Sequence, residues 1–477
     1  MAGEKLLAKR YVENESLLPI PSDKRIYGTA TFTWMMFSMN VCIPLFFLGS
    51  IGLSLGLSLV EVAVGALLGN LATTIVLILN GLPGVKYGIP YPVQLRPSWG
   101  FKGSRIPVVL RGIVGAGWYG IEAYSGSLAM LMVALYIFGF AGRDPTVIAT
   151  TSFRYVAFVV ALYILFATLV TAKGLAMIAR VVNITGPLLI TYFIWLALQL
   201  SGQNGINYPQ TEAGFLSKNF ATYLAIQTNF WATMSLNISD LSRGLHSGRR
   251  GVRALIIGPV VGIVLTSVIA SILGYYLTFH TGYSTPQEIV LYTAPGVLAV
   301  IFGQVFASLA PFSTDITANI PALVNVLTTC FKMKWMKAAV VAGVVGFLLA
   351  PWWAVEKGPD ILNYVVAFTS NYGVILGPIA GIMIADYFIV NKNYDLEKLY
   401  TNGPEGYWYR NGYNLIAIAS YVISVIIIYA FSYSIGDLVM LGPLPFPTSL
   451  SWYIGVISTL VIYSLLAKSI SPGRRKI

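Results

Sequence analysis

The chain has 477 residues, of which 56% are hydrophobic and only 10% are charged, and its formal net charge is +12. A soluble protein of this length needs many more charged side chains on its surface, so the composition excludes an ordinary soluble globular protein. Apolar stretches of about 20 residues, long enough to cross a hydrocarbon core of roughly 30 Å as helices, recur along the chain. The alternation of a membrane β-barrel is not seen. We therefore expect an all-α polytopic membrane protein.

Apolar stretches predict twelve transmembrane helices. They cover residues 29–53, 58–82, 107–137, 153–171, 177–200, 219–239, 254–278, 293–325, 338–353, 361–389, 413–432 and 450–467. The longest remaining segments are tails at 1–28 and 468–477 and loops at 201–218 and 390–412. None of these segments has room for a soluble domain, so we expect the protein to act within the bilayer.

The distribution of basic residues supports this span count and predicts an orientation. With the N terminus placed in the cytoplasm, 26 of the 30 lysines and arginines fall on the cytoplasmic side. Cytoplasmic loops are enriched in Lys and Arg, and a wrong span count would destroy this bias. We expect the protein to lie in the cell membrane with both termini in the cytoplasm. The basic charge needs no nucleic acid to explain it.

Two predicted spans contain signs of interruption. Span 1 holds Asn40 and Pro44 in mid-membrane, and span 6 reads "TNFWATMSLNISDLSRG", which is dense in Asn, Ser and Thr. If ten spans form two halves of five, at 29–200 and 219–389, these two spans occupy corresponding positions. Paired broken helices in an inverted repeat indicate the central site of a transporter. Taken singly, the two features also fit a proline kink and a merely polar helix.

Span 3 carries an isolated carboxylate. Glu122 is the only charged residue between Arg111 and Arg143. Such a charge is costly in the membrane unless it faces a cavity or a partner, so it marks a candidate site. Trp118 lies four residues earlier, on the same helical face. A flat aromatic ring beside a two-acceptor carboxylate suits a planar ligand with N–H groups. The alternatives are a structural link for Glu122 and ordinary packing for Trp118.

Span 8 reads "FASLAPFSTDITANIPALVNV" and gathers several polar groups. Ser313 and Thr314 are adjacent hydroxyls which, with carbonyls freed by a broken helix, can surround a small hard cation. Asp315 and Asn319 lie one turn apart on one face. The Asn319 amide matches the donor–acceptor edge of a pyrimidine or purine. Alternatively, the hydroxyls bond their own helix carbonyls and Asn319 bonds another helix.

Catalytic and metal-binding patterns are not found. The chain has two cysteines, Cys42 and Cys330, and two histidines, His246 and His280. No nucleophile–base order, phosphate loop or dinucleotide turn is recognisable. We expect neither an enzyme, nor a cofactor, nor a disulfide or metal cluster.

Five motifs resemble those of the nucleobase–cation symport family 1, which transports hydantoin, allantoin, uracil, cytosine and purines. They are "GIPYPVQLRPSWGFKGSRIP", "GWYGIE", "FWATMSLNISDLSR", "AxxST" at 310–314 with "AN" at 318–319, and "LGPIAGIMIADYFIV". Together they extend over nearly the whole chain. The resemblance implies two inverted five-helix repeats plus two further helices, broken helices 1 and 6, and alternating access.

The resemblance also implies roles for residues. Trp118 and Trp231 would stack on either side of a planar substrate, and Asn319 would bind its edge. Glu122 stands where the bacterial hydantoin transporter has Gln, and Phe230 where hydantoin transporters have Gly, which narrows the pocket. Asn40 or Cys42 would face the substrate. The cation-binding positions, expected to hold sodium, would be Ala310, Ser313 and Thr314 with the carbonyls of Ser38 and Val41.

The leading hypothesis is a cation-coupled importer of uracil, a purine or allantoin. An amine or amino-acid carrier of the same architecture, and a channel or non-transporting sensor, remain as alternatives. The hydroxyl pair favours sodium as the coupling ion. Glu122 and Asp315 would serve a proton equally well.

Overall fold

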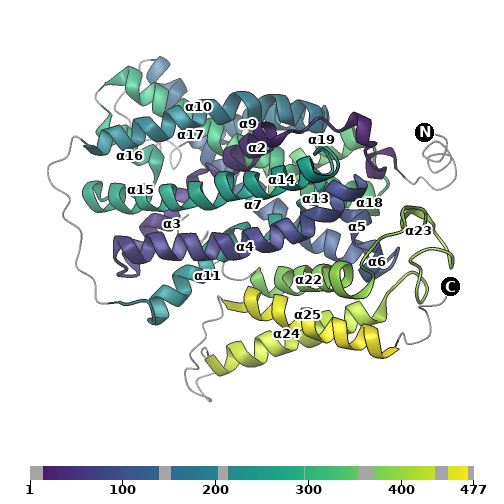
Figure 1. The fold of residues 1–477 in the computed structure, drawn as a ribbon. Coiled ribbons are helices and arrows are strands. Elements are labelled where there is room, and N and C mark those ends of the chain that lie inside the picture. The colour runs from purple at the N-terminus through teal and green to yellow at the C-terminus, as the bar shows by residue number, and fades with distance from the viewer. Residues whose placement is uncertain are drawn as a thin grey trace.

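The structure is a computed structural model that describes residues 14–138, 152–201, 213–294, 296–352, 368–369, 372–435 and 450–470. Its regular elements there are helices, and the only β pairings are two isolated bridges. Figure 1 shows one bundle of long helices, with both chain ends on the same side. We call that side the basic end; it carries η1 (Glu15–Leu17), η2 (Ser22–Lys24), α5 (Tyr91–Gln94), α6 (Arg96–Trp99) and α23 (Leu396–Tyr400).

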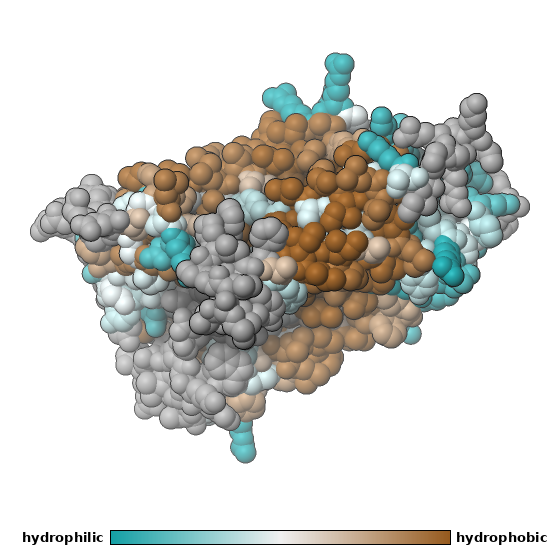
Figure 2. Space-filling view, turned by 90° about the horizontal axis from the view of Figure 1, so that it is seen from below, coloured by the Kyte–Doolittle hydropathy of each residue, from teal (hydrophilic) through white to brown (hydrophobic). Residues whose placement is uncertain are grey.

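The helices suit a bilayer in length and apolarity. Among the described residues, eight helices are long and apolar enough to cross a membrane, and a bent pair makes a ninth. Two shorter apolar helices lie at Trp335–Leu348 and Leu415–Ala430. Figure 2 shows a broad hydrophobic surface between more hydrophilic ends. The all-α polytopic class is confirmed, and the number of twelve spans stays a prediction.

Span 1 is broken as predicted. Its two helices, α2 (Thr29–Asn40) and α3 (Ile43–Ser54), are bent by 56° at the residues between them, Val41 and Cys42. Pro44 is the second residue of α3. There its missing N–H costs nothing, because the first N–H groups of a helix have no partner within the helix. The proline therefore begins the second half-helix rather than kinking a continuous one.

Spans 1, 2, 6 and 7 form one group of helices. The two halves of span 1 pack against α14 (Arg249–Pro259) and α15 (Thr266–Thr281) of span 7. Span 2, α4 (Leu59–Tyr87), packs against α11 (Lys218–Ala232) of span 6. In a repeat of five plus five, the pairing of 1 with 7 corresponds to that of 6 with 2. The contacts therefore agree with an inverted repeat.

A second group contains spans 3, 4, 8 and 9. Span 3, α7 (Arg105–Ile137), packs on α17 (Val297–Thr314) and α18 (Ile320–Cys330), and α9 (Phe153–Ala172) packs on α19 (Trp335–Leu348). Small residues let these backbones approach closely. A Cβ at Gly120 would lie 2.3 Å from the carbonyl oxygen of Leu349. Close packing thus fixes the height and rotation of α7, which carries Trp118 and Glu122.

Several helices depart from regular geometry. Wider π turns occur at η3 (Val260–Leu265), η4 (Asp315–Asn319) and η5 (Asp386–Val390). Span 6 is interrupted at Thr233 and Ile238, which separate α11, α12 (Met234–Asn237) and α13 (Ser239–Ser242). Both residues keep right-handed helical dihedrals, so this interruption is milder than that of span 1. Such π turns often occur at functional sites, and η4 begins directly after Thr314.

The remaining helices are α10 (Leu175–Ser201), α16 (Pro286–Thr293), α22 (Gly373–Ala385), α24 (Leu415–Ile435) and α25 (Ser451–Ile470). The sequence did not predict α16, which begins with a capping box between Thr285 and Glu288. Span 9 starts at Trp335 and ends at Leu348 rather than covering 338–353. Parts of the predicted tails, and residues 361–367 of predicted span 10, lie outside the described residues.

Candidate functional site

Aromatic side chains from three parts of the chain meet at the centre of the bundle. The ring centroid of Phe230 lies 5.3 Å from that of Trp118 and 5.5 Å from that of Trp231, edge-on to both. Phe368, which the sequence analysis did not single out, lies 5.6 Å from Trp118. All three predicted residues are buried. Phe230 therefore lies against both tryptophans that the resemblance places around a planar ligand.

Glu122 lies one helical turn beyond Trp118 on α7 and is 1% exposed. Its carboxyl group is in hydrogen-bonding contact with the thiol of Cys42, at the break of span 1. The Oε2 atom has no partner among the described residues. A buried polar atom without a partner is expensive, and a ligand N–H group would satisfy it. The Cys42 thiol also contacts Thr314, so one side chain lies between the predicted substrate and cation residues.

Asn40 bonds to protein groups on every side. Its Oδ1 accepts a hydrogen bond from the Trp231 indole at 2.6 Å. Its Nδ2 lies within 3.1 Å of the carbonyl oxygens of Gly262 and Ile263 and of the Ser267 hydroxyl. The two carbonyls belong to the π turn η3. In this arrangement Asn40 orients Trp231 and joins spans 1, 6 and 7, and its amide has little capacity left for a substrate.

Asp315 and Asn319 form a buried pair at the two ends of η4. The Asn319 amide donates to Asp315 Oδ1 at 2.9 Å, and the Tyr163 hydroxyl donates to Oδ2 at 3.0 Å. Tyr163 comes from α9 and was not predicted from the sequence. The carboxylate thus holds the Asn319 side chain and fixes which edge of its amide remains for a ligand.

The predicted cation residues come together where α17 passes the break of span 1. The Thr314 hydroxyl donates to the Met39 carbonyl at 2.7 Å and lies 3.3 Å from that of Ala310. Ser313 donates to Thr185 of α10 at 3.0 Å. Thr185 was missed, although it stands in the polar segment "NITGP" of a predicted span.

Span 1 contributes less directly to this cluster than expected. The resemblance implied carbonyls of Ser38 and Val41, whereas the carbonyl that Thr314 contacts belongs to Met39. The Ser38 hydroxyl is buried without a partner among the described residues. A Cβ on Gly186, next to Thr185, would lie 3.0 Å from that oxygen. Oxygen atoms from three helices, the donor type that hard cations prefer, therefore gather within one small region.

A buried arginine ties the helices together below this centre, towards the basic end. Arg111 donates from Nε to the Thr233 carbonyl at 3.0 Å and to Asn237 Oδ1 at 2.9 Å, and from Nη2 to the Ala318 carbonyl at 3.2 Å. Asn237 in turn donates to Asp240. The sequence analysis gave Arg111 no role. These hydrogen bonds join spans 3, 6 and 8.

No group of three or more His, Cys, Asp or Glu side chains suited to a metal ion occurs among the residues described. Both cysteines are free thiols. The polar centre consists instead of carboxylates, amides, hydroxyls and backbone carbonyls beside aromatic rings. Such a set can bind a small polar molecule and a cation.

Comparison with solved structures shows the fold. The chain aligns with Mhp1, a nucleobase-cation-symport-1 family transporter, in a closed conformation with bromovinylhydantoin bound. The TM-score is 0.78 at 21% identity, with 96% of each chain covered. With the inward-facing conformation of Mhp1 the TM-score is 0.73, covering 97% of this chain and 95% of the other. The inverted-repeat transporter fold expected from the sequence is thereby confirmed.

Sequence comparisons show the family. The allantoin permease of Bacillus subtilis (strain 168) is 28% identical over 97% of this chain and 94% of its own length. The purine-uracil permease NCS1 of Arabidopsis thaliana is 27% identical over 87% of this chain and 70% of its own. The family model described as "Permease for cytosine/purines, uracil, thiamine, allantoin" matches residues 19–455. The chain therefore belongs to this family of permeases.

Proposed function

We propose that the protein imports a planar nucleobase or related heterocycle, namely uracil, a purine or allantoin, by symport with a cation. The observation that carries this proposal is the buried Glu122 carboxylate, with one oxygen lacking a partner, one turn from an aromatic cluster. Aromatic faces suit any flat ring and contribute on the order of 0.5–1.5 kcal/mol each beyond area burial. Hydrogen bonds to a charged acceptor contribute roughly 1.5–3 kcal/mol each and select the ring that has matching N–H groups.

The proposed transport path follows from the positions of the two helix groups. The site lies between spans 1 and 6 on one side and spans 3 and 8 on the other. Arg111 connects these groups towards the basic end, and the predicted substrate residues are buried. Alternating access would separate the groups on one side at a time. We propose that the basic end and both termini lie in the cytoplasm and that the protein lies in the cell membrane, because the positive-inside rule favours this orientation.

For the coupling ion, we propose sodium at the oxygen cluster around Thr314. The contact between the Thr314 hydroxyl and the Met39 carbonyl brings a hydroxyl of span 8 to the break of span 1. Ser313, Ser38 and the carbonyl of Ala310 lie in the same region. The competing proposal is a proton held by Glu122 or Asp315. Both carboxyl groups are buried close to the cluster. The two ions predict different dependences of substrate affinity on sodium and pH.

Counterflow in proteoliposomes tests the substrate class. Vesicles preloaded with unlabelled uracil, hypoxanthine, adenine, cytosine or allantoin are diluted into the corresponding radiolabelled compound, with protein-free vesicles as the control. We expect accumulation for at least one ring compound. If an amine or amino acid exchanges and none of the heterocycles does, the result would instead support a carrier of amines or amino acids. Ion flux without any solute exchange would support a channel.

A further inference from the structure

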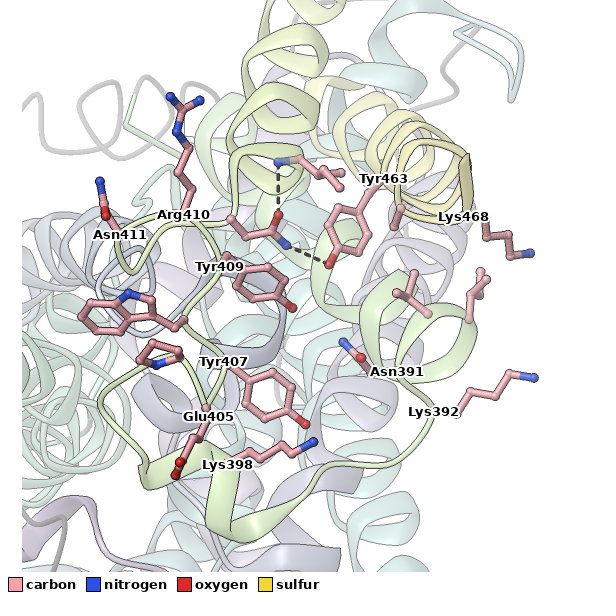
Figure 3. Close-up of a pocket in the computed structure, with 18 of the residues that line it drawn as sticks. Asn391, Lys392, Lys398, Glu405, Tyr407, Tyr409, Arg410, Asn411, Tyr463 and Lys468 are labelled. Carbon is pink, nitrogen blue, oxygen red and sulfur yellow. Dashed lines mark hydrogen bonds between the residues drawn. The ribbon is translucent and has the colours of Figure 1, made fainter. Parts of the chain in front are cut away.

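A large hollow lies at the basic end, away from the central site. It has a volume of about 1480 Å³ and opens between η5, the segment that follows it, and the ends of α24 and α25 (Figure 3). Its lining includes Lys392, Lys398, Glu405, Tyr407, Arg410 and Lys468. Nothing in the proposed transport cycle uses these residues.

The hollow is strongly cationic. Four lysine and arginine side chains line it against one carboxylate, that of Glu405. None of the four cations forms an ion pair with another described residue. Burial raises the pKa of Tyr407 to about 12, so its phenol stays neutral and leaves the positive charge intact. A region with this charge attracts an anionic group.

The wall of the hollow is held in place by a buried network. Asp386, the first residue of η5, accepts hydrogen bonds from Tyr463 of α25 at 2.8 Å and from Asn391 at 2.8 Å. Tyr394, in the segment before α23, donates to the same carboxyl group at 3.2 Å. These bonds join span 10, the following loop and the last helix. The hollow therefore has walls that are already positioned before any ligand arrives.

The basic side chains lie around the mouth as well as inside. Figure 3 shows the Lys398 ammonium group beside Tyr407, facing the hollow, while Lys392 and Lys468 extend towards the same outer side. Lys392 follows η5 and Lys468 is near the end of α25. An anionic group at the mouth would therefore meet positive charge from α25 and from the segment between η5 and α24.

Apolar side chains lie on the same elements. Phe388 of η5 is 38% exposed, and on α25 Val461 and Leu465 are 47% and 64% exposed. In a membrane these side chains face acyl chains. A soluble phosphate compound would use the cations alone, whereas a lipid would use both the cations and this adjacent apolar surface.

We propose that the hollow binds the headgroup of an anionic lipid, whose acyl chains lie along the exposed faces of η5 and α25. Basic pockets at the cytoplasmic ends of transmembrane helices are suited to such headgroups. The site joins the two C-terminal helices to span 10, so a bound lipid would strengthen that contact. This proposal uses the orientation given above and does not depend on the transported compound.

The test measures lipid binding rather than transport. Purified protein in detergent is titrated with phosphatidylglycerol or phosphatidylcholine, and bound lipid is followed by native mass spectrometry and by the rise in Tm. We expect the wild type to prefer phosphatidylglycerol at least tenfold. The triple variant Lys392→Gln, Lys398→Gln, Lys468→Gln should lose this preference. Lys398→Gln alone, which perturbs the fold less, should weaken it severalfold.

A matched triple variant removes the same charge elsewhere at the basic end. Arg249→Gln, Arg250→Gln, Arg253→Gln alters three exposed arginines in the first turns of α14, and should bind phosphatidylglycerol like the wild type. Equal losses in both triple variants would overturn the proposal, since binding would then follow net charge alone. Equal binding of phosphatidylcholine would also overturn it. Glycerol phosphate that competes as well as the lipid would identify a site for soluble anions and would likewise overturn it.

Discussion

The indole N–H of Trp231 donates a hydrogen bond to the side-chain oxygen of Asn40 at 2.6 Å. Asn40 is the last residue before the break of span 1, and Trp231 comes shortly before the first interruption of span 6. A movement of span 1 or span 6 would therefore displace the Trp231 ring in the aromatic cluster directly. This contact also explains why an amide stands in the middle of an apolar span.

The contact leads to a prediction about Asn40 and Trp231. Asn40→Ala leaves the indole N–H and two carbonyls of η3 without their partner, so it should lower stability by about 1–3 kcal/mol and weaken substrate binding. Trp231→Phe removes the indole N–H but keeps an aromatic ring. Thermal unfolding and equilibrium binding of the two single variants and the double variant measure the coupling. Strictly additive effects would show that the pair does not act as a unit.

Trp118 provides a second prediction. Trp118→Ala should abolish uptake of every substrate, because it removes an aromatic wall that all flat rings share. Radiolabelled uptake at matched membrane abundance is the measurement. Trp335→Ala is the control, since that indole bonds the Thr171 carbonyl at the end of α9 and should be dispensable for uptake. Normal uptake by Trp118→Ala would assign Trp118 to packing.

Glu122 provides the third prediction. Glu122→Gln should retain the fold and change the order of substrate preference, because an amide offers one acceptor where the carboxylate offers two. Glu122→Leu should eliminate binding. Competition by a panel of bases is the measurement, with Glu61→Gln, at the capping box of α4, as the control. An unchanged competition profile in Glu122→Gln would make Glu122 a structural link to Cys42.

The fourth prediction concerns the coupling ion. Ser313→Ala with Thr314→Ala should raise the sodium concentration needed for transport steeply, while substrate still binds at saturating sodium. Coupling is reciprocal, so saturating substrate should tighten sodium binding to the wild type by a factor of roughly 5–150. Thr328→Ala, whose hydroxyl bonds a carbonyl of its own helix, is the control.

Substrate affinity is measured against sodium at fixed pH, and then against pH without sodium. Wild-type affinity that ignores sodium but follows pH would contradict the sodium proposal. The hydroxyls would then serve only to bond backbone carbonyls, and Glu122 or Asp315 would carry a proton.

Features set by local sequence were predictable, whereas features set by distant contacts were not. Pro44 and the polar residues around it indicated the break of span 1, because a proline begins a helix for local steric reasons. The groups to which Asn40 donates belong to span 7, more than 200 positions away, and its donor Trp231 belongs to span 6. Arg111 was given no role from the sequence, because the carbonyls that accept its hydrogen bonds lie at the interruption of span 6 and in η4. No residue type in the segment "DITAN", which forms η4, predicts a π turn.

The residues to which the resemblance gives roles differ in how well their positions agree with those roles. Trp118, Phe230, Trp231 and Glu122 are all buried, with Phe230 against both tryptophans, and their roles stay predictions. Asn40 instead bonds neighbouring helices, and Met39 takes the place at Thr314 that was expected for Ser38 or Val41. A shift of one residue at a broken helix cannot be resolved from sequence, because there neither helical periodicity nor a hydrophobic face fixes the register.

The π turn η4 determines how the predicted substrate residue Asn319 is oriented relative to the predicted cation residue Thr314. In an α-helix, Thr314 and Asn319 would point roughly 140° apart around the axis, because each residue turns the chain by about 100°. Here the Ile320 N–H bonds the Asp315 carbonyl, five residues back, so the extra residue widens the turn. If the turn lost this extra residue and became a regular α-helix, Asn319 and the residues after it would rotate by about 100° around the helix axis relative to Thr314. The orientation of the predicted substrate residue Asn319 relative to the predicted cation residue Thr314 therefore depends on whether this turn keeps its extra residue.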